Sequence, residues 1–341
     1  MLPIDRRILL AALSAATLVR PAAAVARTNR VDVHHHYFPP AMLEAQIAAR
    51  AERIIPGVRE WTPARTLAAM DAGGVGTAFV STSSSAEVRK SLDKEGLRRL
   101  ARACNEFAAQ MATDHHGRFG FFTFLPLPDI DGSLDELQYA LDVLKADGIG
   151  MMTSYDDKWL GDDRFTPLLD ELNRRKATVF VHPLAPACCG NLIPGVANSI
   201  LEYPYDTGRA VLSLLFNGRF VQYRNIAWIF CHAGGPIPML AGRVVTQTKA
   251  NKDLARVAPH GIDEELKRLH YETANSVYAP TMAALMKYVP VSQILLGSDY
   301  PYVAVEDNVE RLQKIGLDFA QLNAIERDNA KKLFPRLNAR F

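Results

Sequence analysis

Short apolar runs alternate along this chain with longer segments in which apolar residues recur at helical spacing. Leu134, Leu137, Leu141 and Leu144 show the helical spacing, with one apolar residue every three or four positions. Because most of the short runs are apolar, they are typical of parallel strands that are covered on both faces. We expect eight such strands, at residues 31–36, 77–82, 119–125, 148–152, 177–182, 226–232, 269–273 and 293–298.

Eight strands that alternate with helices predict a (β/α)8 TIM barrel, with residues 38–62 and 184–225 as a small cap of loops and helices. The alternative is a doubly wound open sheet. That fold normally places a glycine-rich loop after its first strand, and here His34-His35-His36 occupies that position. We therefore expect residues 27–341 to form a single barrel domain.

Residues 1–26 differ from the rest of the chain. Arg6-Arg7 precedes an apolar run that ends near Val19, and Ala24-Val25-Ala26 follows as a small-residue cleavage site. The pattern predicts a twin-arginine signal peptide and a periplasmic protein, although Arg20 interrupts the pattern. If the segment is not a signal, it stays attached and the protein is cytoplasmic.

Composition narrows the class of protein. Hydrophobic residues make up 48% of the chain and charged residues 22%, with a net charge of +2. This is the balance of a globular enzyme, and no basic block points to a nucleic-acid partner. No stretch after the first segment is long and apolar enough to span a membrane. The four cysteines form no C-x-x-C motif, which argues against a zinc–thiolate site.

The strongest chemical signal is a set of polar residues at the predicted carboxyl ends of strands. His34 and His36 lie two residues apart, so both project from one face of the first strand. His182, His232 and Asp299 end three later apolar runs. In a barrel these ends meet on one face, where imidazole and carboxylate groups can bind a divalent metal, with zinc favoured and manganese an alternative. Taken singly, each could be a core histidine or a turn residue.

Four motifs together resemble the amidohydrolase-related metalloenzymes, in the branch of aminocarboxymuconate-semialdehyde, 6-methylsalicylate and γ-resorcylate decarboxylases. The motifs are Asp32-Val33-His34-His35-His36, Phe180-Val181-His182-Pro183, His232-Ala233-Gly234-Gly235 with Gly242-Arg243, and Leu296-Gly297-Ser298-Asp299-Tyr300-Pro301. The resemblance implies a metallo-dependent hydrolase barrel and a homodimer. It implies that His34, His36, His182 and Asp299 bind one metal, and that His232 is the catalytic acid/base. It also implies that Arg65 and Arg243 bind the substrate carboxylate, with Arg243 reaching a neighbouring subunit.

The expected activity is metal-dependent, non-oxidative decarboxylation of an aromatic or unsaturated, hydroxybenzoate-like carboxylic acid. His232 or Asp299 would protonate the carbon that bears the carboxylate, while the metal acts as a Lewis acid. The alternative is hydrolysis of an ester, lactone or amide by a metal-activated water, with Asp299 as the base. The segment 202–209 and Gly242-Arg243 favour the decarboxylase by resemblance, because the metal ligands serve both reactions equally.

Overall fold

A computed structural model describes residues 29–50, 55–83, 85–249 and 253–339. Within these ranges, eight parallel strands form one sheet in the order β1-β2-β3-β4-β7-β8-β9-β10. A two-stranded antiparallel hairpin, β5 (Ser154–Tyr155) and β6 (Lys158–Trp159), was not expected from the sequence. The eight strands are β1 Arg30–His36, β2 Val75–Ser81, β3 Phe119–Phe124, β4 Gly148–Met152, β7 Thr178–His182, β8 Ala227–Phe230, β9 His270–Glu272 and β10 Ile294–Leu295.

The first and last strands meet along a seam of backbone hydrogen bonds, which closes the barrel. Val33 N donates to Leu296 O at 2.9 Å, and Asp299 N donates to His34 O at 2.8 Å. His36 N donates to Tyr300 O at 2.8 Å. The prediction of a (β/α)8 barrel is therefore confirmed, and the open-sheet alternative is wrong.

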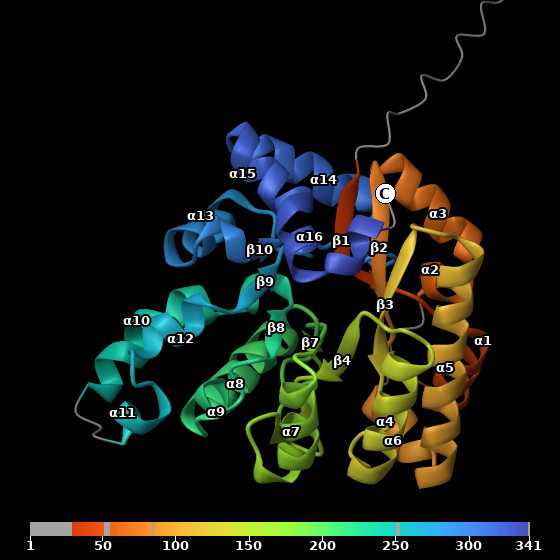
Figure 1. Cartoon of the computed structure of the whole chain (residues 1–341), viewed down its shortest axis with the longest axis horizontal. Helices are drawn as coiled ribbons and strands as arrows, with labels where there is room; N and C mark the ends of the chain where they lie inside the picture. Colours follow the sequence, from red (N-terminus) through yellow and green to blue (C-terminus); the bar gives the residue numbers. More distant parts are fainter. Residues whose placement is uncertain (1–28, 51–54, 84, 250–252, 340–341) are drawn as a thin grey trace, which may run out of the picture.

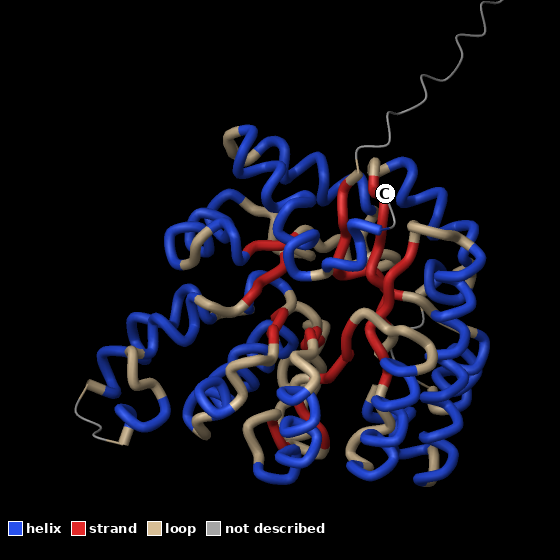
Figure 2. Tube along the Cα trace, in the orientation of Figure 1, coloured by secondary structure: helices blue, strands red, loops and turns tan. Residues whose placement is uncertain are grey.

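Helices surround the strands (Figures 1 and 2). Thr62-Pro63 is typical of a helix start, and the structure confirms it: the Thr62 side chain caps α3, where Pro63 is the first residue. The Asp93 side chain caps α5 in the same way. The sequence of residues 318–333 predicts a single helix, but the structure has α15, a π-helical turn and α16 there. The helices are α1 Pro40–Ala48, α2 Pro56–Arg59, α3 Pro63–Ala72, α4 Ala86–Ser91, α5 Lys94–Asp114, α6 Ile130–Asp142, α7 Thr166–Arg174, α8 Glu202–Phe216, α9 Arg219–Gln222, α10 Ile237–Thr248, α11 Leu254–Val257, α12 Ile262–Lys267, α13 Ala279–Tyr288, α14 Val305–Lys314, α15 Phe319–Asn323 and α16 Asn329–Leu333.

The barrel interior is filled by large apolar side chains from successive strands. Phe79, Phe122 and Phe180 belong to one buried cluster with Val31 and Val33, and the rings of Phe122 and Phe180 stack at 4.9 Å. The end of the chain completes this cluster, because Phe334 stacks on Phe79 at 4.1 Å. The interior is thus a packed core below the carboxyl ends of the strands.

An irregularity in β1 changes which side chains face inward. Asp32 pairs with Ala78 of β2, whereas His35 pairs with Val80, so β1 advances three residues while β2 advances two. The extra residue is a β-bulge, which breaks the alternation of side chains. Asp32 therefore lies on the side of His35, and its Oδ2 is 2.9 Å from His35 Nδ1. Strict alternation along the strand predicts that Asp32 shares the inward face of His34, and this prediction is wrong because of the bulge.

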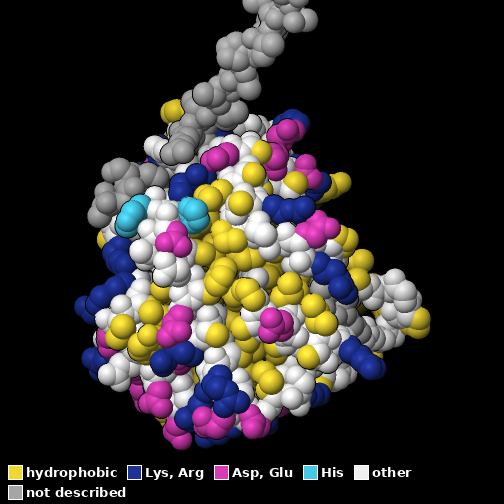
Figure 3. All heavy atoms as spheres, turned by 90° about the vertical axis from the view of Figure 1, so that its right-hand side faces the viewer, with side chains coloured by type: hydrophobic (Ala, Val, Ile, Leu, Met, Phe, Trp, Pro, Cys, Tyr) yellow, Lys and Arg dark blue, Asp and Glu magenta, His cyan; other side chains and the backbone are white. Residues whose placement is uncertain are grey.

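The surface over α1, α2 and α5 is unusually apolar. Figure 3 shows a broad area of hydrophobic side chains on this side of the molecule, with charged side chains around it. Ile47 of α1 is among the exposed residues, at 48%.

No helix in the described ranges is both long and apolar enough to cross a membrane. The expected signal segment, residues 1–26, lies outside the described residues.

Candidate functional site

The structure brings four of the predicted residues together at the carboxyl ends of the strands. One ligand atom from each of His34, His36, His182 and Asp299 lies within 4.8 Å of the others. His34 Nε2 is 3.1 Å from His36 Nε2, and Asp299 Oδ1 is 2.9 Å from His36 Nε2 and 3.2 Å from His34 Nε2. These side chains come from β1, the end of β7 and the turn after β10, so the seam of the barrel runs through the cluster.

The donor set fits one divalent metal ion. Ligand atoms in a tetrahedral site with bonds near 2.0–2.1 Å lie about 3.3 Å apart, close to the spacing found here. The second ring nitrogens of two histidines are bonded elsewhere: His34 Nδ1 is 2.9 Å from Glu272 Oε1, and His182 Nδ1 is 2.8 Å from Pro183 O. Because a carbonyl oxygen only accepts, His182 carries its proton on Nδ1 and leaves the Nε2 lone pair free.

The electrostatics of two of these residues, His182 and Asp299, favour the protonation states that bind metal. Burial, together with the neighbouring His36 and His34, holds the pKa of His182 well below its usual value, so the imidazole is neutral. Burial alone would raise the pKa of Asp299. The charges and hydrogen bonds of His34 and His36 outweigh burial and hold that pKa well below its usual range. A neutral imidazole and an ionised carboxylate are the forms that bind metal.

His232 lies beside this cluster in a tight turn after β8. Its ring centroid is 5.2 Å from that of His34, and its backbone has a left-handed φ of 54°. His232 Nδ1 is 3.0 Å from Ala274 O and must donate to it, which leaves Nε2 without a proton in the neutral ring. Close approach shapes this turn, since a Cβ on Gly235 would lie 2.2 Å from Pro204 O.

Two functional residues were missed by the sequence analysis. Glu272 is fully buried at the end of β9 and contacts both His34 and the backbone of His232. Asn275 donates a hydrogen bond from Nδ2 to Asp299 Oδ2. The signal for Glu272 was a carboxylate at the carboxyl end of a predicted strand, the same position that pointed to the histidines. Asn275 gave no signal, because it follows the strand in a turn rich in small polar residues.

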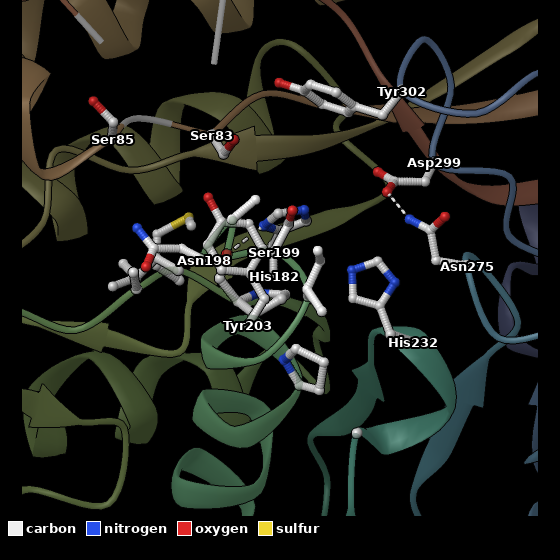
Figure 4. Close-up of a pocket in the computed structure, with 18 of the residues that line it drawn as sticks. Ser83, Ser85, His182, Asn198, Ser199, Tyr203, His232, Asn275, Asp299 and Tyr302 are labelled. Carbon is white, nitrogen blue, oxygen red and sulfur yellow. Dashed lines mark hydrogen bonds between the residues drawn. The ribbon is translucent and has the colours of Figure 1, made fainter. Parts of the chain in front are cut away.

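The cluster opens into a cavity of about 760 Å³, within the range of small-molecule sites. Figure 4 shows His182, His232, Asn275 and Asp299 around it, with Tyr203 and Tyr302 among its walls. Met152 and Leu184 add apolar surface. Residues 197–200, within the segment 184–225 that we expect to form part of a cap, also line the cavity.

The two predicted arginines do not line this cavity. The Arg65 side chain is 55% exposed and pairs with Glu60 at 2.6 Å. Arg243 is exposed on α10. Within the part of the chain that the structure describes, the cavity lining contains neither arginine nor lysine. Any arginine that contacts a ligand there therefore has to move or to come from a second subunit.

Comparisons with known proteins identify relatives over most of the chain. The sequence pattern of the amidohydrolase family matches residues 31–336. Decarboxylase yanB of Aspergillus niger is 33% identical over 324 residues, which cover 90% of this chain and 88% of that protein. The 6-methylsalicylic acid decarboxylase acuB of Aspergillus aculeatus is 32% identical over 319 residues, covering 90% of this chain and 96% of the relative.

Solved structures share the fold. A 5-carboxyvanillate decarboxylase from Novosphingobium aromaticivorans, complexed with manganese and 4-hydroxy-3-methoxy-5-nitrobenzoic acid, superposes with a TM-score of 0.79. The match covers 90% of this chain and 96% of that chain, at 19% sequence identity. At this identity the likeness speaks for the barrel architecture alone.

Proposed function

This chain belongs to the amidohydrolase family, and on that premise we propose that it is a metal-dependent carboxy-lyase acting on a hydroxybenzoate-like acid. The observation that carries the proposal is the free Nε2 of His232 beside a cluster of three imidazoles and one carboxylate. Relatives that share about a third of their residues over 90% of the chain are decarboxylases, one of them for 6-methylsalicylic acid. We infer a salicylate-type substrate, with a hydroxyl group next to the carboxylate.

His34, His36, His182 and Asp299 would hold one divalent ion. When bound, the metal supplies Lewis-acid stabilisation of negative charge on substrate oxygens. Three imidazoles and a carboxylate suit zinc, whereas the fold relative crystallised with manganese supports that metal as the alternative. Metal analysis of the purified protein, followed by chelation and reconstitution with each ion, decides between them.

His232 supplies the acid chemistry. With Nδ1 committed to Ala274 O, Nε2 is the nitrogen that exchanges a proton with the cavity. The protonated ring gives that proton to the substrate carbon bearing the carboxylate, and a new C–H bond forms. The C–C bond to the carboxylate then breaks, its electron pair returns to the aromatic ring of the substrate, and CO2 leaves. A positioned histidine suits this step because an imidazole can both hold and release a proton.

The walls of the cavity position the substrate. Tyr302 packs edge-on against His36, with ring centroids 5.4 Å apart, and also lines the cavity. With Met152 and Leu184 it forms apolar surface against which an aromatic ring packs. This surface excludes water from the carbon that receives the proton.

We also propose a homodimer in which Arg243 of one copy reaches the cavity of the other and binds the substrate carboxylate. Arg243 is exposed on α10, and Met239, one turn earlier, is 75% exposed. We propose that Arg65 is the second residue that binds the substrate carboxylate. To do so, its guanidinium group would leave Glu60, with which it forms an ion pair. Light scattering would give the oligomeric state. In a dimer, Arg243→Ala should raise KM more than it lowers kcat.

Residues 1–26 are proposed to direct export to the periplasm by the twin-arginine route, leaving a mature chain that begins near Arg27. The support is the sequence pattern alone. Cell fractionation and N-terminal sequencing of the secreted form test it. Recovery of the uncut chain in the cytoplasm would show that the segment is not a signal.

The function is tested on purified residues 27–341 with the metal content measured in parallel. Salicylates and other hydroxybenzoates are offered alongside aryl esters and lactones, and both CO2 release and hydrolysis are recorded. CO2 release that stops on chelation supports the carboxy-lyase. Hydrolysis without CO2 would favour the alternative, in which the same residues activate water.

A further inference from the structure

Glu272 uses both oxygens of its buried carboxylate. Oε1 accepts from His34 Nδ1 at 2.9 Å and from the backbone N of His232 at 2.6 Å. Oε2 accepts from Ala274 N at 2.5 Å. The group is surrounded by donors, so it is held as the ionised carboxylate, because a protonated acid would need an acceptor.

The bond to His34 fixes the tautomer of that ring. A carboxylate accepts the Nδ1 proton, which leaves the lone pair of Nε2 directed at His36 and Asp299. Nε2 is the atom that belongs to the proposed metal site. Carboxylates that bond the far nitrogen of a metal-binding histidine orient its ring and raise its basicity.

The bonds to His232 and Ala274 fix a second ring indirectly. Oε2 holds the amide of Ala274, whose carbonyl accepts from His232 Nδ1. Oε1 holds the amide of His232 itself, a non-glycine residue with a left-handed φ. Such a conformation is unfavourable by about 1–3 kcal/mol and persists only where its surroundings hold it. The Glu272 carboxylate therefore holds both the backbone conformation and the ring tautomer of His232.

The neighbourhood does not suit a second metal. His34, Cys231 and Glu272 also lie within 4.8 Å of one another. However, burial raises the pKa of the Cys231 thiol to about 12, so it stays protonated at neutral pH. The carboxylate of Glu272 is already shared among three N–H donors. We therefore interpret Glu272 as a residue that positions its neighbours, and not as a ligand of a second metal ion.

We propose that Glu272 is a positioning residue that sets the tautomers of both His34 and His232 and so couples the metal site to the proton donor. The inference rests on the proposed function for the roles of those two histidines. Its test uses ring tautomers and metal affinity, which need no substrate. Failure of the wild-type protein to release CO2 would overturn the function and leave this inference standing.

The test is Glu272→Gln in protein labelled with 15N at histidine. Whichever way the amide turns, its NH2 group faces an N–H donor, either that of Ala274 or those of His34 and His232. We expect His34 to shift toward the Nε2–H tautomer in the metal-free NMR spectrum, recorded at a pH high enough that the ring is neutral, because, against the effect of burial, neighbouring Cys231, Glu272 and Asp299 raise its pKa. We expect zinc and manganese affinity to fall by roughly 10- to 100-fold.

Glu136→Gln is the matched control. Glu136 is also buried, accepts from Asn105 at 2.8 Å and Arg102 at 2.9 Å, and lies on α6 away from the cavity. The Glu136→Gln protein should be less stable than wild type, but it should keep the wild-type histidine tautomers and the wild-type metal affinity. Wild-type tautomers and affinity in Glu272→Gln would overturn the proposal, as would an equal loss of affinity in Glu136→Gln. If Glu272→Gln does not fold, Glu272→Asp replaces it, with the same signs expected and the same outcome overturning the idea.

Discussion

Asn275 donates a hydrogen bond from Nδ2 to Asp299 Oδ2, so the two oxygens of that carboxylate have separate partners. Oδ1 is left facing His36 at 2.9 Å. Both residues have left-handed backbones, with φ of 54° and 65°. Two left-handed turns, after β9 and β10, thus meet at one hydrogen bond that selects which oxygen faces the proposed metal site.

Removing this bond should weaken the site without unfolding the barrel. In Asn275→Ala the Asp299 carboxylate can rotate, and we expect metal affinity and kcat to fall by roughly 10- to 100-fold. Metal titration and steady-state kinetics measure this. Asn217→Ala is the control, since Asn217 is exposed and its Nδ2 bonds only Ser213 O in the last turn of α8. Equal losses in both variants would contradict the prediction.

Proton transfer and metal binding should separate by mutation. His232→Asn keeps a polar side chain in the turn but removes the transferable proton, so kcat should fall by about 10²–10⁴-fold while the metal is retained. His36→Ala removes a proposed ligand, so metal and activity should be lost together. Metal analysis of both proteins checks this. Stoichiometric metal in His36→Ala would exclude that residue as a ligand.

Gly297 leaves room for the carboxylate of Glu272, which lies below the proposed metal site. A Cβ at this position would lie 1.9 Å from Glu272 Oε2 and 2.9 Å from His34 Cβ. Gly297→Ala should therefore cost about 1–3 kcal/mol of stability through overpacking and also lower metal affinity. Gly242→Ala in α10, where no atom lies within 4 Å of the added carbon, should instead raise stability by about 0.5–1 kcal/mol. Thermal unfolding of both variants tests the contrast.

His270 should make stability depend on pH. Burial lowers the pKa of His270 to about 4, below the value of about 6.5 in the unfolded chain. Between these values only the unfolded state takes up the proton, so stability falls as pH drops from 6.5 to 4 and levels off below. At pH 5 the loss from this group is about 2 kcal/mol. In urea unfolding, His270→Gln should lose less stability than wild type between pH 7.5 and 5; parallel curves would refute this.

Periodicity was sufficient to predict the barrel, because most strands are apolar runs between helical segments. The same logic located His34, His36, His182 and Asp299, since the barrel brings strand ends together. Alternation failed at Asp32, where a bulge inserts one residue that no local pattern announces. Glu272 was missed because its role depends on His34, 238 residues away in the chain. The helix expected over 318–333 contains a π-helical turn whose Ile325 carbonyl accepts from Leu296 N, a tertiary contact.

The seam between β1 and the segment after β10 sets the order in which the protein can mature. His34 and His36 are made early in synthesis, whereas Asp299 follows more than 260 residues later. Phe334, which completes the interior cluster, comes later still. A nascent chain therefore lacks the complete set of proposed ligands until Asp299 has been made, and the set is assembled only once the two ends of the chain have met. Loading of the proposed metal would then report that the barrel has closed.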